Sequence, residues 1–161
     1  MKSALLLLAV FVSSSVFAQK KSPHDTVSNG TLTVTYGRPY KKDRVVFGTL
    51  EKYGKVWRVG ADEATTVTFE TDVKFAGQTV KAGSYTMFAI PNETEWTIIL
   101  NSVLGQWGAY SYEKNKASDV AKFNVSVKKL DKVVEQLTIR FATGQMIIEW
   151  DQTQVVVPIS Y

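Results

Sequence analysis

Residues 31–36 read Thr-Leu-Thr-Val-Thr-Tyr, and this stretch decides the fold. Its apolar side chains, Leu32, Val34 and Tyr36, occupy every second position, and threonines occupy the positions between them. Successive side chains of a β-strand point to opposite faces, so a period of two predicts a strand with one buried face. We therefore expect the threonines to face outward and the three apolar residues to face a core.

The same alternation returns along the rest of the chain. Stretches with a period of two lie at residues 65–70, 123–127, 137–141, 146–150 and 155–159. Residues 85–90 and 96–100 are apolar on both faces, which is typical of central strands that are covered on both sides. Residues 73–75 and 79–81 flank Gly77 and predict a hairpin.

Turn-forming residues separate these stretches, and one such turn is expected at Asp151-Gln152. No long amphipathic helix is visible, and a short helical turn is expected at residues 102–106 or 112–119. Strands that recur roughly every 8–12 residues indicate an antiparallel sandwich or barrel. We predict an all-β protein, an antiparallel β-sandwich of jelly-roll-like form with about 9–10 strands, with closure toward a barrel as the alternative.

The first 18 residues have the layout of a secretory signal peptide. Lys2 supplies a basic start, residues 4–12 are all apolar, and the segment ends in small or apolar residues up to Ala18. A membrane-spanning helix needs roughly 20 apolar residues, so no membrane span is predicted. We expect cleavage near Ala18, export to the periplasm or the medium, and a single domain over residues 19–161.

The composition excludes several classes of protein. The 161 residues include no cysteine, so disulfides, thiolate metal ligands and thiol catalysis are excluded. The net charge is +4, and the lysines occur in pairs instead of a long basic stripe, so we expect no nucleic-acid partner. No glycine-rich phosphate loop precedes a helix, and we expect no cofactor.

Two stretches depart from the alternation. Residues 37–64 are polar, glycine-rich and irregular, yet they hold many aromatic residues and arginines. Residues 105–112, Gly-Gln-Trp-Gly-Ala-Tyr-Ser-Tyr, combine glycines with aromatic side chains. Long ordered segments between strands often carry function, and aromatic surfaces often line ligand sites. We expect both segments to cap one end of the sandwich.

These segments predict a site for a small polar or anionic ligand. A guanidinium group binds carboxylates and phosphates through two parallel hydrogen bonds, and indole rings supply apolar walls. An alternative role for Arg58 and Glu63 is a partly buried ion pair that ties the irregular segment to the end of the sheet. The candidate ligand-binding residues are Arg38, Arg44, Trp57, Arg58, Glu63, Trp107 and Tyr110.

Candidates for catalysis are few. His24 is the only histidine, and it could act as a general base or join Asp25 and Glu63 at a metal. A lone histidine cannot form a two-histidine site, and we predict no metal centre. The Gly-x-Ser-x-Gly pattern of serine hydrolases is missing. Acidic residues that could form a glycosidase pair are Asp62, Glu63, Glu149 and Asp151. The catalytic residues remain unassigned.

Several strings of residues resemble one bacterial family. They are residues 36–39 (Tyr-Gly-Arg-Pro), 47–50 (Phe-Gly-Thr-Leu), 53–65 (Tyr-Gly-Lys-Val-Trp-Arg-Val-Gly-Ala-Asp-Glu-Ala-Thr), 82–88 (Ala-Gly-Ser-Tyr-Thr-Met-Phe), 95–101 (Glu-Trp-Thr-Ile-Ile-Leu-Asn) and 106–110 (Gln-Trp-Gly-Ala-Tyr). On these strings the chain is identified as a member of the exported bacterial domain-of-unknown-function family 2911, over about residues 22–159. The resemblance implies export and a single domain, and it supplies no catalytic residues.

Three functions are compatible with these observations. The favoured hypothesis is an exported, non-catalytic binding module for a small polar or anionic ligand such as a sugar. The alternatives are a small hydrolase with Glu63 or His24 as general base, and an envelope accessory protein that acts through its surface. An enzyme requires that His24 or Glu63 line a concave site, whereas a surface adaptor would show an exposed apolar patch and no pocket.

Overall fold

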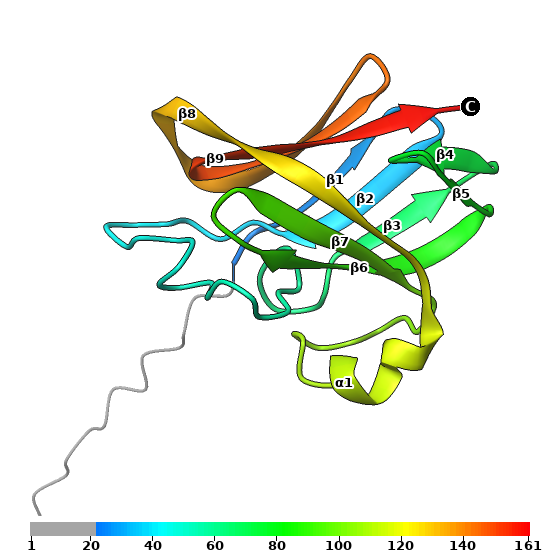
Figure 1. Cartoon of the computed structure of the whole chain (residues 1–161), viewed down its shortest axis with the longest axis horizontal. Helices are drawn as coiled ribbons and strands as arrows, with labels where there is room; N and C mark the ends of the chain where they lie inside the picture. Colours follow the sequence, from blue (N-terminus) through cyan, green and yellow to red (C-terminus); the bar gives the residue numbers. More distant parts are fainter. Residues whose placement is uncertain (1–21) are drawn as a thin grey trace, which may run out of the picture.

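The computed structural model describes residues 22–161, so the predicted signal peptide and its cleavage site lie outside the described residues. Nine strands make up most of this part of the chain (Figure 1). They are β1 (His24–Ser28), β2 (Leu32–Gly37), β3 (Thr66–Phe69), β4 (Val73–Phe75), β5 (Gln78–Val80), β6 (Gly83–Pro91), β7 (Glu95–Asn101), β8 (Asp119–Ala142) and β9 (Gln145–Ser160). A helical turn, α1 (Tyr112–Asn115), and a 3-10 turn, η1 (Lys116–Ser118), lie at the second of the two predicted helical positions.

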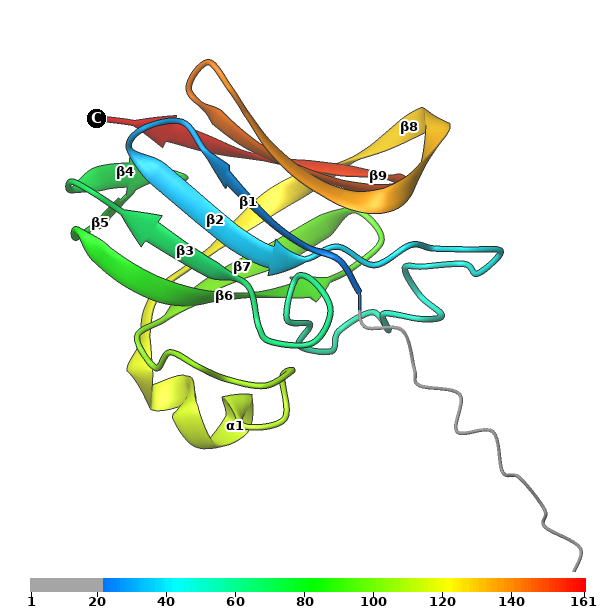
Figure 2. The ribbon, with the colours of Figure 1, turned by 180° about the vertical axis from the view of Figure 1, so that it is seen from behind.

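The strands form one antiparallel sheet in the order β1-β2-β3-β6-β7-β8-β9-β4-β5. The long strands β8 and β9 cross over β1 and β2, as the views from the front and from behind show (Figures 1 and 2). The sheet therefore folds into two facing layers, and it does not close into a barrel. The predicted antiparallel β-sandwich is confirmed, and the barrel alternative is wrong.

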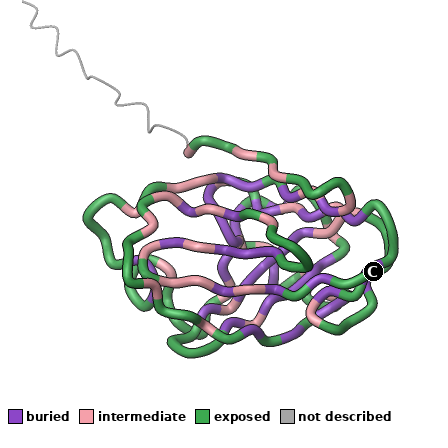
Figure 3. Tube along the Cα trace, turned by 90° about the horizontal axis from the view of Figure 1, so that it is seen from above, coloured by how far each residue is buried: buried purple, intermediate pink, exposed green. Residues whose placement is uncertain are grey.

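The core lies between the two layers. Leu32, Val34 and Tyr36 of β2 are buried there, and the threonines between them are partly or fully exposed, as the alternation predicted. Leu137 and Ile139 of β8 are buried in the same cluster. Burial of one large aliphatic side chain contributes roughly 1.5–3 kcal/mol, so these positions carry much of the stability. Figure 3 shows buried stretches through the body of the molecule and exposed stretches in the peripheral loops.

The two apolar strands, β6 and β7, are central and covered on both faces, as predicted. One face of each strand contributes to the main core, for example through Met87 and Ile98. Phe88 and Ile99 face the other way and pack with Ala64 and Tyr112 in a second, smaller cluster. The residues around α1 therefore cover the outer face of the sheet.

The turn predicted at Asp151-Gln152 is wrong, because β9 runs without interruption from Gln145 to Ser160. The pairing of β8 with β9 instead shifts register around the Val134–Asp151 pair, and Asp151 has a φ of 55°. Trp150 and Val155 are both buried although they are separated by an odd number of positions. An irregularity of this kind returns the side chains to the core face without a turn.

Segment 37–64 leaves the sheet after β2 and returns at β3. Backbone pairing holds it at three places along its length. Near its start, Lys41 donates its backbone N–H to the carbonyl of Glu135 in β8. Further along, Trp57 pairs with Ala89 of β6. Near its end, Glu63 pairs with Trp107 of the second irregular segment, so the two segments lie side by side. None of the helices in residues 22–161 combines the length and the apolar character needed to cross a bilayer.

Candidate functional site

A cavity of about 980 Å³ lies where segment 37–64 meets the 105–112 loop and the first described residues. Its size is within the range of small-molecule sites, roughly 300–1,000 Å³. The lining residues are Ser22, Pro23, Pro39, Tyr40, Lys42, Arg44, Leu50, Glu51, Arg58, Gly60, Ala61, Asp62, Trp107 and Trp150. The wall therefore combines three cationic side chains, two carboxyl groups and three aromatic rings.

Arg58 is the most informative residue of this cavity. Among the described residues, its Nε atom has no hydrogen-bond partner although the atom is buried. A buried donor left unpaired costs about 1–3 kcal/mol, and more where the group is charged. A ligand oxygen accepting from this N–H would remove that cost.

Glu51 adds a titrating group to the same wall. Burial raises the pKa of its carboxyl group from 4.5 to about 7, although the positive charges of Arg58 and Arg44 act in the opposite direction. The net charge of the cavity therefore changes near neutral pH. Protonated Glu51 leaves both arginines available to an anion, and ionised Glu51 competes with that anion for them.

The backbone between Arg58 and Glu63 is held in an unusual conformation. Val59 has a φ of 55°, which is rare for a β-branched residue, and Asp62 has a φ of 64°. A Cβ atom at Gly37 would collide with the backbone of Ala61, so only glycine lets the turn approach the end of β2 this closely. Strained residues of this kind persist only where the surrounding packing enforces them, and they concentrate at functional sites.

Three of the seven predicted ligand-binding residues, Arg44, Arg58 and Trp107, line the cavity. Arg44 is exposed and donates to the backbone carbonyls of Lys41 and Tyr40, which fixes the loop that carries it. Trp107 is 54% exposed. The two segments that the sequence singled out thus contribute to one concave surface.

Two other predicted residues lie elsewhere. Trp57 is only 2% exposed and packs against Phe47, Trp96 and Trp150, so it belongs to the core. Tyr110 is 85% exposed and does not line the cavity. Trp150 of β9 lines the cavity, although it is 1% exposed and packs in the same core cluster as Trp57.

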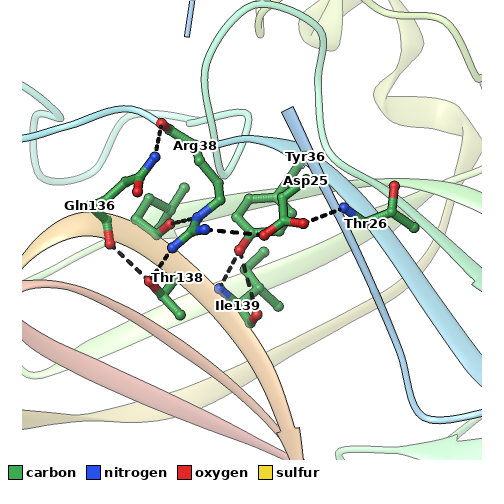
Figure 4. Close-up of polar contacts among 8 residues, drawn as sticks. Asp25, Thr26, Tyr36, Arg38, Gln136, Thr138 and Ile139 are labelled. Carbon is green, nitrogen blue, oxygen red and sulfur yellow. Dashed lines mark hydrogen bonds and ion pairs between the residues drawn. The ribbon is translucent and has the colours of Figure 1, made fainter. Parts of the chain in front are cut away.

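Arg38 has a structural position between the two layers (Figure 4). Its guanidinium donates to the backbone carbonyl of Leu137 at 3.0 Å, to the Thr138 hydroxyl at 3.0 Å and to the Asp25 carboxylate at 3.2 Å. Beside it, the Tyr36 hydroxyl accepts from the backbone N–H of Ile139 at 2.8 Å. These contacts join β1 and β2 to β8.

Glu63 lies in a second, smaller pocket of about 260 Å³. Its Oε2 is 3.0 Å from Nε2 of His24, and both residues line this pocket with Thr35, Tyr36 and Thr66. The sequence raised a His24–Glu63 pairing only as one option. Strand β1 brings the two together, because it pairs His24 with Gly37 at the end of β2.

A family profile described as "Protein of unknown function (DUF2911)" matches residues 18–159. The chain belongs to the DUF2911 family. The resemblance seen in its sequence strings is confirmed, and the DUF2911 match includes every residue that lines the two pockets. Neither the curated proteins nor the solved structures contain a match to this chain.

Glu51 is one of the cavity residues that the sequence analysis of this DUF2911 chain did not predict. It lies in a tight loop in which its N–H donates to Val46 and its carbonyl accepts from Gly48. The sequence did contain an indication of its role, because Glu51 lies among Phe47, Leu50 and Tyr53. Acidic side chains in aromatic surroundings are candidates for a shifted pKa.

Proposed function

We propose that this DUF2911 protein is a binding module for a small anionic ligand that carries hydroxyl groups, such as an acidic sugar. The observation that carries the proposal is the buried Nε of Arg58: Arg58 is a residue of the cavity wall, and this atom has no acceptor among the described residues. A carboxylate or phosphate oxygen is the acceptor that a guanidinium binds most strongly.

The rest of the wall supports the same class of ligand. Lys42 and Arg44 add positive charge, and Tyr40 and Trp107 add aromatic surface of the kind that packs against a sugar ring. Glu51 and Asp62 are acceptors for ligand hydroxyl groups. The combination of a few polar groups with apolar walls is typical of ligand pockets. A surface adaptor would not need such a cavity.

The proposal also includes export of the protein from the cytoplasm. Residues 1–18 carry the signal-peptide pattern, and we propose that the domain from Gln19 onward acts in the periplasm or outside the cell. Fractionation of cells that express the whole chain, followed by mass determination of the product, tests this step. An uncleaved chain in the cytoplasm would contradict it.

Calorimetric titration tests the binding function. The chain from Gln19 onward, which contains every described residue, is titrated with D-glucuronate and with glucose at pH 6, where Glu51 is mostly protonated. We expect saturable binding of glucuronate and weaker binding of glucose. Arg58→Met should weaken glucuronate binding at least about tenfold, because hydrogen bonds to charged groups contribute about 1.5–3 kcal/mol.

Arg140→Met is the matched control, since it removes one arginine that pairs with Glu149 outside the cavity. Binding should be unchanged in this variant. If inorganic phosphate and sugar phosphates bind instead of glucuronate, with the same loss in Arg58→Met, the anion site is retained and the sugar assignment changes. Absence of binding for all these anions, or equal losses in both variants, would overturn the proposal.

A hydrolase remains a second candidate because of one observation: the His24–Glu63 pair, 3.0 Å apart, lines the smaller pocket as a general base must. Chromogenic glycosides and esters serve as substrates for the test. Activity that disappears in both His24→Gln and Glu63→Gln would support this candidate, and activity retained in either variant would exclude the pair as the base.

A further inference from the structure

The turn at residues 59–63 brings two carboxylates to the only histidine of the chain. Asp62 and Glu63 are adjacent in this turn, and His24 opens β1 beside it. One side-chain oxygen of each acidic residue and one imidazole nitrogen of His24 all lie within 4.8 Å of one another. His24 is more than 35 positions away from Asp62 and Glu63 in the sequence. The fold therefore brings the histidine to the two carboxylates.

One acceptor of the cluster lacks a donor within residues 22–161. Among the described residues, Oδ2 of Asp62 is buried and has no hydrogen-bond partner. The Glu63 carboxylate lies 3.0 Å from the imidazole of His24. Two carboxylates held together cost free energy unless a positive charge lies between them. A buried acceptor without a donor adds to that cost.

We infer that His24, Asp62 and Glu63 bind a divalent cation of the first transition series, such as Zn²⁺ or Mn²⁺. One imidazole nitrogen with two carboxylate oxygens is a donor set that suits these metals better than Mg²⁺ or Ca²⁺, which prefer oxygen alone. Bonds of about 2.1 Å place ligand atoms at most roughly 4.2 Å apart, so a pair at the 4.8 Å limit needs only a small side-chain rotation to bind one metal ion.

The position of the cluster leaves the metal accessible. Glu63 and His24 line the smaller pocket, whereas Asp62 lines the cavity of about 980 Å³. Three protein donors leave at least one coordination position for water or a ligand group, which is the arrangement of open metal sites. The metal site shares Asp62 with the wall of the larger cavity, whereas Arg44 and Arg58, which are proposed to hold the anion, are not among the metal donors.

Metal titration tests the site with the purified chain from Gln19 onward, free of any histidine tag and treated with EDTA. Calorimetry with Zn²⁺ should show one saturable site per chain. Because the protein has a single histidine, its imidazole ¹⁵N signals form one set, and Zn²⁺ should shift them. Co²⁺ should give d–d absorption bands that added Zn²⁺ removes.

Three variants and one control decide the result. His24→Gln, Asp62→Asn and Glu63→Gln should each weaken Zn²⁺ binding at least tenfold while far-UV circular dichroism shows that the fold is retained. Glu70→Gln removes an exposed carboxylate outside the cluster and should leave binding unchanged. Unsaturable binding, an unmoved imidazole signal, or affinity that survives in the folded variants would overturn the inference.

Discussion

Replacing Glu51 with glutamine should stabilise the protein above neutral pH and have little effect at pH 4. Burial raises the pKa of this carboxyl group to about 7 in the folded protein, against 4.5 as its ordinary value. Between these two values the folded state binds more protons than the unfolded state. The free energy of unfolding therefore falls as the pH rises through this window.

The magnitude follows from the size of the shift. One pKa unit corresponds to about 1.4 kcal/mol, so ionisation of Glu51 costs the folded state about 3 kcal/mol once the pH is above 7. Well below pH 4.5 the group is neutral in both states, so its contribution at pH 4 is small. Glutamine keeps the size and polarity of the side chain and cannot ionise, so the variant should avoid this loss.

Urea unfolding at pH 4 and at pH 8.5 measures the effect. The difference in the free energy of unfolding, Glu51→Gln minus wild type, should be about 3 kcal/mol larger at pH 8.5 than at pH 4, which means that the variant is the more stable protein at pH 8.5. Glu70→Gln, which alters an exposed carboxylate, should show no such difference. A pH dependence that is identical in the wild type and in Glu51→Gln would refute the assignment of a buried, titrating carboxyl group to this cavity.

Four further variants test the framework by urea unfolding at pH 7. Tyr36→Phe should cost about 1–3 kcal/mol, because the buried N–H of Ile139 loses its acceptor; an unchanged midpoint would contradict this contact. Arg38→Met should lower stability by a similar amount, because it removes contacts that join β2 to β8. Arg58→Met should leave stability unchanged or higher, as expected for a ligand-binding residue. A loss of stability in Arg58→Met with none in Arg38→Met would make Arg58 the structural residue and contradict both assignments. Gly37→Ala should cost about 1–3 kcal/mol, because its Cβ meets a backbone carbonyl, and a neutral result would show that the turn can move.

The layers of the fold were predictable because burial follows the alternation directly. Residues 31–36 became β2 with the expected face buried, and residues 85–90 and 96–100 became the central strands β6 and β7. Strand β1 was not predicted, since His24–Ser28 holds a single apolar residue and lies at the edge of the sheet. Edge strands carry little of the hydrophobic pattern that such predictions use.

The strands near the C-terminus show where a period of two is ambiguous. A break in the alternation between Trp150 and Val155 fits either a turn that starts a new strand or a bulge that lets one strand continue. The structure contains the second, with Asp151 at a φ of 55°. Likewise residues 123–127 and 137–141, which read as two strands, are both parts of β8. The described residues therefore form nine strands, which is within the predicted number of about 9–10.

The site was predictable as a region and less so as a set of residues. Segment 37–64 and the 105–112 loop stood out by composition, and both line the cavity. Residue type alone could not show which aromatic ring lines the cavity. Trp57 and Trp107 both lie in irregular segments of the sequence, yet Trp57 is buried in the core and Trp107 is exposed. The partner of Glu63 depended on the pairing of β1 with β2, which brings His24 beside the turn.

The indole N–H signals of the four tryptophans offer the most direct measurement of the central claim, that an anionic ligand binds in the cavity of about 980 Å³. Trp107 and Trp150 line this cavity, whereas Trp96 is buried elsewhere in the core. Titration of ¹⁵N-labelled protein with D-glucuronate at pH 6 should shift the signals of Trp107 and Trp150 in a saturable way and leave that of Trp96 in place. The same titration of Arg58→Met should produce no saturable shift. Unmoved signals for Trp107 and Trp150 in the wild type, or shifts that persist in Arg58→Met, would contradict the account.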